Sequence, residues 1–154
     1  MTPLMQLIEE AETEFENLEE TIREVNELLL IVSKKVPSNI EKAAAIQYLS
    51  QYYNGIENIL KRIIKYKKIP LIKSEQWHTE LLDSFELNSN KSKFPLFNNT
   101  LMEHLNSYKK IPHVVRQGYN FQLDWERLSV ALKYMEPVYN SFKNIITEYI
   151  NNIE

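Results

Sequence analysis

The spacing of apolar residues at the start of the chain constrains the fold more than any other feature. Apolar side chains recur at intervals that alternate strictly between four and three residues, at Leu4, Ile8, Ala11, Phe15, Leu18, Ile22, Val25, Leu29 and Val32. This heptad pattern predicts one helix of about 30 residues, roughly 45 Å long, that buries a single face. Thr2 is expected to cap the helix and Pro3 to occupy its first position.

The composition favours helices throughout. Among 154 residues there are only two Gly and no Cys, and 44% of the chain is apolar. The missing cysteine excludes a disulfide framework, a thiolate nucleophile and a zinc–thiolate site. The first residues do not read as a signal peptide, and the longest purely apolar run, residues 28–32, is far too short to cross a membrane. We therefore expect one soluble, cytoplasmic domain spanning residues 1–154.

A second long helix is expected after Pro37. Ser38 and Glu41 form a capping-box pattern, and the helix should run to about Tyr66. Gly55 lies in the middle of this helix, where it costs roughly 1 kcal/mol against Ala unless a neighbouring backbone needs the space. A close helix crossing is therefore expected there. The predicted inward face consists of Ile40, Ala44, Tyr48, Tyr52, Ile56, Ile59, Ile63 and Tyr66.

The rest of the chain predicts three more helices. Ser74 should cap a short helix that reaches Phe85, and residues 87–97 look like a linker. Thr100 and Glu103 form a second capping-box pattern for a fourth helix. Asp124 should cap a final helix that ends near residue 150 and kinks at Pro137. The predicted fold is an all-α, up-down bundle of four to five helices.

Charge is distributed unevenly along the chain. Residues 9–27 carry nine Glu and a single Arg, whereas residues 61–73 carry six cations and no acid. A second basic group follows at Lys91, Lys93, Lys109, Lys110 and Arg116. These cations can bind the phosphates of RNA, and Lys65, Lys68, Lys109 and Lys110 are the candidates. The alternative is a set of solvated helix ends, where lysines offset the helix dipole.

Residues 109–119 hold the strongest candidate for chemistry. If Pro112 opens a helical turn, His113, Arg116 and Gln117 share one face. A His and an Arg beside a phenol can bind a phosphodiester and transfer protons near neutral pH. The alternative is an ordinary helix end with a hydrogen-bonded His. Neither a metal site nor a phosphate-binding glycine loop is predicted, and His78 and His104 are expected to be a packed and an exposed residue.

Four segments together resemble one known family. These are residues 53–57 (YNGIE), Trp77-His78, residues 113–119 with Tyr119 at the end, and residues 124–127 (DWER). In order and spacing they are similar to the HepT-like branch of the HEPN superfamily. That resemblance implies an all-helical, dimeric ribonuclease toxin encoded beside a minimal nucleotidyltransferase antitoxin. It therefore implies a homodimer and a nucleotidyltransferase as partners, with RNA as the substrate.

The family motif is an Arg, four residues, a His, one residue and a Tyr. On this sequence the three positions hold Pro112, Gln117 and Tyr119. Pro112 offers no cation and Gln117 cannot shuttle a proton, so the acid–base contribution of about 10²–10⁴ in rate should be missing. The resemblance also implies that the antitoxin adds AMP to Tyr119.

Two functions therefore compete. In the first, the chain is a catalytically degenerate relative that binds RNA or the nucleotidyltransferase. In the second, it is a metal-independent ribonuclease that uses His113 and Arg116 instead.

Overall fold

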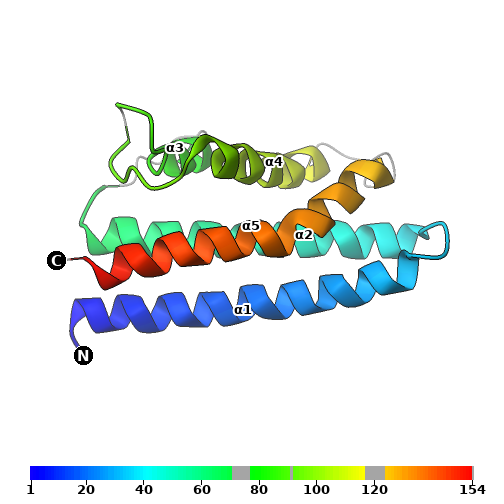
Figure 1. Ribbon diagram of the computed structural model, residues 1–154, viewed down its shortest axis with the longest axis horizontal. Helices are drawn as coiled ribbons and strands as arrows, with labels where there is room; N and C mark the ends of the chain where they lie inside the picture. The colour runs from blue at the N-terminus through cyan, green and yellow to red at the C-terminus, as the bar shows by residue number, and fades with distance from the viewer. Residues whose placement is uncertain (71–76, 91, 117–123, 154) are drawn as a thin grey trace.

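The described residues form five helices. They are α1 (Pro3–Val32), α2 (Asn39–Tyr66), α3 (Trp77–Asp83), α4 (Asn99–Arg116) and α5 (Trp125–Asn151). This computed structural model describes residues 1–70, 77–90, 92–116 and 124–153, with residues 112–116 as backbone. The long helices α1, α2 and α5 lie side by side, and α3 and α4 form a layer on α2 and α5 (Figure 1). The predicted all-α bundle is confirmed.

Three helix starts agree with their predicted caps. The Thr2 hydroxyl accepts a hydrogen bond from the Met5 amide at 3.1 Å, and Pro3 begins α1. The capping box at α2 is complete, with Ser38 Oγ accepting from the Glu41 amide at 3.2 Å and Glu41 Oε1 accepting from the Ser38 amide at 2.8 Å. At α5, the carboxylate of Asp124 accepts from the backbone amide two residues later at 3.0 Å. These caps satisfy amides that a helix leaves without partners.

The predicted start of α4 was wrong. The cap is Asn98, whose Oδ1 accepts from the Leu101 amide at 2.9 Å, so Thr100 lies inside the first turn. Asparagine caps a helix better than threonine, which explains the earlier start. Pro112 was expected to open a new helical turn, but it lies inside α4, which continues to Arg116. Ser74, the predicted cap of α3, lies outside the described residues.

The heptad face of α1 is buried from Ala11 to Val25, and it departs from the predicted positions toward both ends, where Leu4 is only partly buried. Ile8 is 36% exposed while Leu7 is buried in its place, and near the other end Leu28 is buried more deeply than Leu29. A straight helix drifts by about 20° per heptad against a strict seven-residue repeat, so the buried stripe moves to neighbouring positions. On α2, the predicted core residue Ile40 is 83% exposed because it lies in the first turn, beside the α1–α2 connection.

Gly55 marks the expected close crossing of α1 and α2. A Cβ atom built at this glycine would lie 2.7 Å from Cδ2 and 2.9 Å from Cγ of Leu18, which is fully buried on α1. The two helices can approach this closely only because position 55 has no side chain. The prediction from the sequence is confirmed.

Two tyrosines from other helices donate hydrogen bonds to backbone carbonyls of α5. Tyr52 on α2 donates to the Met135 carbonyl at 2.9 Å, and Tyr108 on α4 donates to the Ala131 carbonyl at 2.7 Å. The helix continues through Pro137, and it bends along its first half in Figure 1, as a proline inside a helix predicts. The two hydrogen bonds satisfy buried phenol groups and hold α5 against α2 and α4.

The segment expected to be a linker packs against α3. Phe94 stacks on Phe85 with ring centroids 4.8 Å apart, and Phe97 lies 5.6 Å from the same ring. The Leu87 amide donates to the Phe97 carbonyl at 2.8 Å, which holds the two ends of the segment together. The three phenylalanines extend the core beneath the α3–α4 connection.

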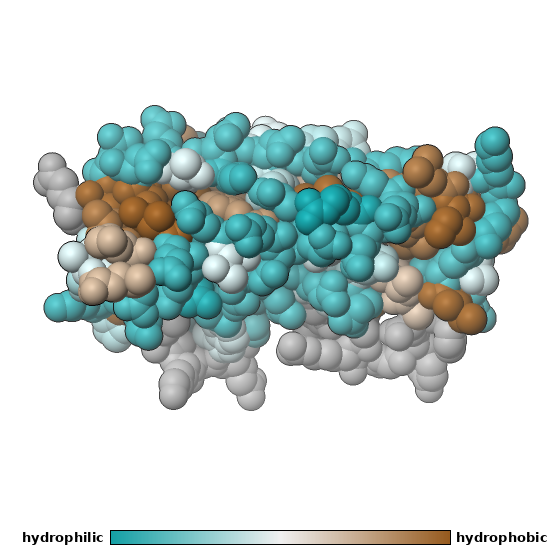
Figure 2. All heavy atoms as spheres, turned by 90° about the horizontal axis from the view of Figure 1, so that it is seen from below, coloured by the Kyte–Doolittle hydropathy of each residue, from teal (hydrophilic) through white to brown (hydrophobic). Residues whose placement is uncertain are grey.

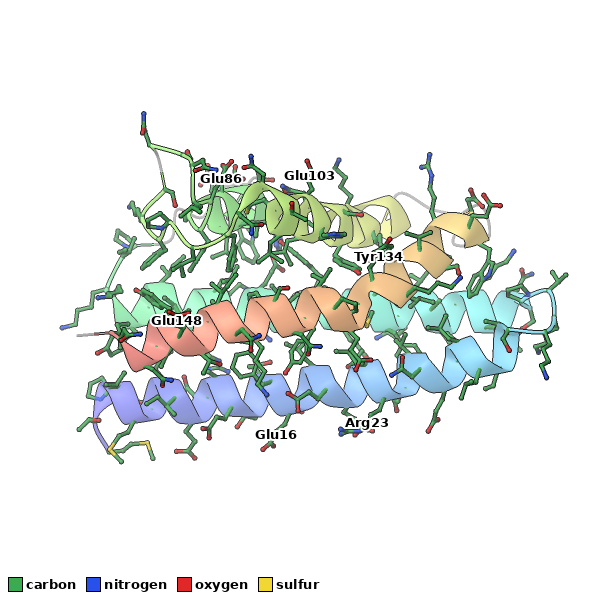
Figure 3. All side chains as sticks on the ribbon, viewed as in Figure 1. Glu16, Arg23, Glu86, Glu103, Tyr134 and Glu148 are labelled. Carbon is green, nitrogen blue, oxygen red and sulfur yellow. The ribbon has the colours of Figure 1, made fainter. Side chains whose placement is uncertain are left out.

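The outer surface is mostly polar. Glu16 and Arg23 on α1, Glu103 on α4 and Glu148 on α5 point away from the bundle (Figure 3). Seen from the α1 side, the molecule is hydrophilic in the middle and apolar toward both ends (Figure 2). The exposed apolar residues there are Met1, Met5 and Ile8 at one end and Leu30, Ile31, Val36 and Ile40 at the other.

Candidate functional site

The residues of the family motif are only partly visible. Pro112, His113 and Arg116 belong to the last turns of α4, and the structure describes their backbone. Gln117 and Tyr119 lie outside the described residues. His113 and Arg116 lie three residues apart in α4. Whether these side chains form a site stays a prediction.

Lys109, one of the predicted phosphate-binding cations, is held in place by neighbours. Its ammonium donates to Asn106 Oδ1 at 2.8 Å and to Thr79 Oγ1 at 3.5 Å, so it links α4 to α3. Burial lowers the pKa of Lys109, an effect that nearby Asp83 and Glu57 oppose. Lys110, the next residue, is exposed.

Lys65 and Lys68 lie elsewhere. The pKa of Glu10 on α1 is lowered by a hydrogen bond from Gln6, with smaller contributions from Arg62 and Lys65. Lys65 therefore faces the acidic surface of α1. Lys68 follows the end of α2 with a positive φ of 58°, which helps to turn the chain away from the helix. The structure thus does not gather the four predicted lysines into one patch.

A buried acid–imidazole pair joins α2 to α3. Nδ1 of His78 lies 2.6 Å from Oε2 of Glu57. The carboxylate is 4% exposed, whereas the imidazole is 35% exposed. An ionised carboxylate only accepts hydrogen bonds, so Nδ1 carries the proton and donates it to Glu57. This fixes the orientation and the tautomer of the ring.

A tyrosine hydroxyl without a partner lies in the same place. Tyr53, one helical turn before Glu57, is 2% exposed, and its hydroxyl forms no hydrogen bond with the described residues. Burial raises the pKa of Tyr53, and the charges of Glu57 and Asp83 raise it further. The phenol is therefore neutral and offers a free donor in an apolar environment.

Trp77 and Lys61 complete the surroundings of the imidazole. The rings of Trp77 and His78 have centroids 3.5 Å apart, and the Lys61 ammonium lies 4.3 Å from the centroid of the Trp77 ring. A hollow of about 300 Å³ borders Trp77 on α3, and Glu80, Asp83 and Lys93 are its charged lining residues. We call Tyr53, Glu57, Lys61, Trp77, His78 and Lys109 the α3 cluster. It combines a base, two ammonium groups and an aromatic ring.

Sequence reasoning treated His78 as a packed residue and did not pair it with Glu57. The pairing is long-range, because 21 residues separate the two side chains. One signal was present: Glu57 stands four residues after Tyr53 and three before Leu60, inside a stripe that is otherwise buried and uncharged. An acid in such a stripe requires a partner, since an unpaired buried charge is costly.

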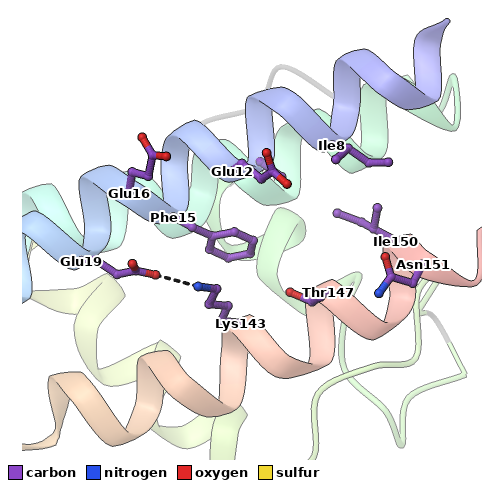
Figure 4. A pocket seen from close by; sticks show the side chains of 10 residues that line it. Ile8, Glu12, Phe15, Glu16, Glu19, Lys143, Thr147, Ile150 and Asn151 are labelled. Carbon is purple, nitrogen blue, oxygen red and sulfur yellow. Dashed lines mark hydrogen bonds and ion pairs between the residues drawn. The ribbon is translucent and has the colours of Figure 1, made fainter.

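A groove between α1 and α5 is a second candidate. It encloses about 370 Å³, with Phe15 and Ile150 forming an apolar floor (Figure 4). Glu12, Glu16 and Glu19 line its rim opposite the single cation Lys143. This excess of negative charge opposes binding of a polyanion. The groove is therefore a poor site for RNA.

The described residues contain neither a cluster of metal ligands nor a membrane-spanning helix. Within residues 1–70, 77–90, 92–116 and 124–153, no three His, Asp or Glu side chains converge as a metal site would require. Over the same part of the chain, no helix combines the length and hydrophobicity needed to span a bilayer.

Comparison with known families identifies the chain. The family model described as HepT-like protein matches residues 44–153, from the first turns of α2 through the end of α5. Comparisons with curated proteins and with solved structures gave no match. The matched region covers more than half of the chain and includes the whole α3 cluster as well as the motif segment. The chain therefore belongs to the HepT-like protein family.

Proposed function

We propose that this chain is the HepT-like member of a toxin–antitoxin module that binds RNA in the cytoplasm and has lost the family's motif chemistry. The observation that carries the proposal is the pair of substitutions inside the matched region, Pro112 and Gln117. A proline has no cationic group for phosphate, and a glutamine amide does not titrate near neutral pH. The usual acid–base step has no residue at these positions.

RNA binding is supported by the cations around α3. Lys61 and Lys109 both lie beside the first turn of α3, and exposed Lys110 follows on α4. Ammonium groups bind phosphates, and an aromatic ring such as Trp77 stacks on unpaired bases. Lys65 and Lys68 are less favourable, because Lys65 faces the acids of α1.

Salt dependence tests the proposal. Titration of a labelled single-stranded RNA should show affinity falling with salt, with a logarithmic slope of about −2 if three phosphates are contacted. Lys110→Gln should lower the affinity and reduce the slope. Lys34→Gln, an exposed lysine at the opposite end of α2 beside the α1–α2 turn, is the matched control. Binding that is absent at low salt, or insensitive to salt, would contradict the proposal.

The loss of motif chemistry is tested by restoring it. Pro112→Arg combined with Gln117→His should raise RNA cleavage above that of the unaltered protein, because it returns a phosphate ligand and a proton shuttle. His113→Ala should leave any basal cleavage unchanged. Cleavage that disappears in His113→Ala would instead favour the second function, a displaced active site built from His113 and Arg116.

The proposal includes a minimal nucleotidyltransferase as partner. Membership of the HepT-like family supports it, and Tyr119 remains at the motif position that the partner would modify. Incubation with the neighbouring nucleotidyltransferase and ATP should add one AMP to the protein, seen by mass spectrometry. Tyr119→Phe should prevent the addition, and modification of that variant would exclude Tyr119 as the acceptor.

The proposal also includes a homodimer. The heptad face of α1 is used inside the bundle and is not free for a partner. The exposed apolar group at the α1–α2 turn, Leu30, Ile31, Val36 and Ile40, supports self-association instead. Light scattering at micromolar protein should give twice the chain mass, and a concentration-independent monomer would contradict this.

A further inference from the structure

We propose that His78 is a general base for RNA strand cleavage and that Glu57 positions it. The site is the α3 cluster, separate from the family motif. The inference rests on the proposed RNA binding and adds the residue that would react. It assigns proton transfer to His78 in the α3 cluster, and not to the substituted positions 112 and 117.

The imidazole is arranged as a base. Its Nδ1–H is committed to Glu57 at 2.6 Å, so the lone pair is on Nε2. Within the described part of the chain, Nε2 has no hydrogen-bond partner, and the side chain is 35% exposed. One nitrogen is therefore anchored in the interior while the other is free to meet a substrate.

Glu57 fixes the position of the ring. The carboxylate is 4% exposed on a helix face that otherwise buries Tyr53, Leu60 and Ile64. The packing around it holds the acid, and therefore the imidazole bonded to it, in one place. Glu57 also keeps the ring from rotating, because a 2.6 Å charge-assisted bond is short and directional.

The surrounding residues fit a ribonucleotide. Lys109, partly desolvated, reaches Asn106 and Thr79, the residue after His78. The Lys61 ammonium lies over the ring of Trp77, the residue before His78. Ammonium groups next to an imidazole can contact a phosphodiester, and an aromatic ring such as Trp77 can stack on a base. The Tyr53 hydroxyl, one helical turn before Glu57, has no partner among the described residues.

The reaction needs no added oxidant or reductant. Nε2 of His78 removes the proton of a ribose 2′-hydroxyl, and the 2′-oxygen attacks the adjacent phosphorus. The bond from phosphorus to the 2′-oxygen forms as the bond to the 5′-oxygen breaks. The departing 5′-oxygen takes up the proton from imidazolium, directly or through water. The products are a 2′,3′-cyclic phosphate and a 5′-hydroxyl end, and DNA, which lacks the 2′-hydroxyl, is not cut.

The competing explanation is that the pair only fastens α3 to α2. A buried ion pair can serve that purpose, and it accounts for the Nδ1 contact. It does not account for the second nitrogen, which has no partner among the described residues, or for the two ammonium groups beside the residues that flank His78. The two explanations predict different RNA cleavage when the imidazole is replaced by a side chain that keeps the hydrogen bond to Glu57.

His78→Asn is that replacement. The asparagine amide can donate to Glu57 as Nδ1–H does, but it cannot accept a proton at neutral pH. With a single-stranded RNA as probe, we expect cleavage to fall by at least about 100-fold while RNA affinity and melting temperature stay close to those of the unaltered protein. His104→Asn, at the histidine that stacks on Tyr134 away from α3, is the matched control and should cleave normally. A DNA strand of the same sequence should be bound and left intact.

Glu57→Gln tests the positioning role separately. Glutamine still accepts the Nδ1–H bond but carries no charge, so kcat should fall by at least about tenfold while KM for RNA is unchanged. If His78→Asn does not fold, His78→Gln replaces it. In whichever variant folds, free imidazole should restore part of the cleavage, beyond what imidazole does to RNA alone. A purely structural pair would show neither the kcat effect nor the rescue.

The outcomes separate the two proposals. RNA that is bound but not cut by the unaltered protein overturns this inference and leaves the proposed function standing. Cleavage that survives in His78→Asn also overturns it. RNA that is not bound at all removes the proposed function, and the inference with it.

Discussion

Two glutamates, one on each side of the bundle, have similar neighbours and different surroundings. Glu19 on α1 accepts from the Lys143 ammonium at 2.8 Å and from the Tyr139 hydroxyl, and its side chain is 36% exposed. Glu57 on α2 faces His78 in the core, with its side chain 4% exposed. Each acid has one basic partner and one tyrosine nearby.

The difference lies in whether every polar group has a partner. At Glu19, the Tyr139 hydroxyl donates to the acid and also contacts the Phe15 carbonyl at 3.3 Å, so the group is closed. At Glu57, the Tyr53 hydroxyl has no partner within the described chain. The polar groups around Glu19 are all hydrogen-bonded, which fits a structural role. A buried polar group without a hydrogen-bond partner among the described residues, such as the Tyr53 hydroxyl, can still bind a ligand. The α3 cluster is therefore the stronger candidate for a functional site.

The largest expected difference is in stability. Glu57→Ala should lower the free energy of unfolding by about 3 kcal/mol, because it removes one partner of a buried pair and leaves a void in the core. Glu19→Ala should cost less than about 1 kcal/mol, since its ion pair is largely solvated. Urea denaturation of both variants measures the difference. Equal losses would show that the two acids play the same role.

The tyrosines should respond with opposite signs. Tyr139→Phe removes a hydroxyl that is fully hydrogen-bonded and should cost about 1 kcal/mol. Tyr53→Phe removes an unpaired buried hydroxyl and should be neutral or stabilising by up to about 1 kcal/mol. Thermal unfolding of the two variants side by side provides the measurement. A clear loss of stability in Tyr53→Phe would mean that its hydroxyl already has a partner.

The smallest effect concerns pH. Hydrogen bonds from Lys143 and Tyr139 lower the pKa of Glu19 below its usual value of 4.5. A carboxyl with a lowered folded-state pKa adds stability above the unfolded-state pKa and loses it as pH falls through the folded-state value. The unaltered protein should therefore be more stable than Glu19→Gln above about pH 4.5, by less than about 1 kcal/mol, and the gap should close at lower pH. A gap that widens on acidification would contradict this.

The sequence predicted the helices well because their signals are local. The caps at Thr2, Ser38 and Asp124 and the glycine at position 55 each act within a turn or at one crossing. The start of α4 was misplaced because Asn98 and Thr100 are both plausible caps two residues apart.

The candidate site was harder to predict because it is assembled from distant segments. Glu57 and His78 meet only after α3 packs on α2, and Lys109 arrives from α4. Nothing in the spacing of these residues along the chain shows that they converge. The sequence also could not show that the lysines of residues 61–73 face different neighbours. Lys65 lies near Glu10 of α1, whereas Lys61 lies over Trp77 of α3.

Pro137 interrupts the backbone hydrogen bonding of α5 and divides the helix into two halves. It has no amide hydrogen to bond the carbonyl four residues earlier, so the helix is softest there. Ahead of it, the Ala131 carbonyl is fastened to Tyr108 of α4, and after it, the Tyr139 hydroxyl is fastened to the Phe15 carbonyl of α1. The Met135 carbonyl, also ahead of the proline, accepts from Tyr52 of α2. The half of α5 before Pro137 is therefore bonded to α2 and α4, and the half after it to α1.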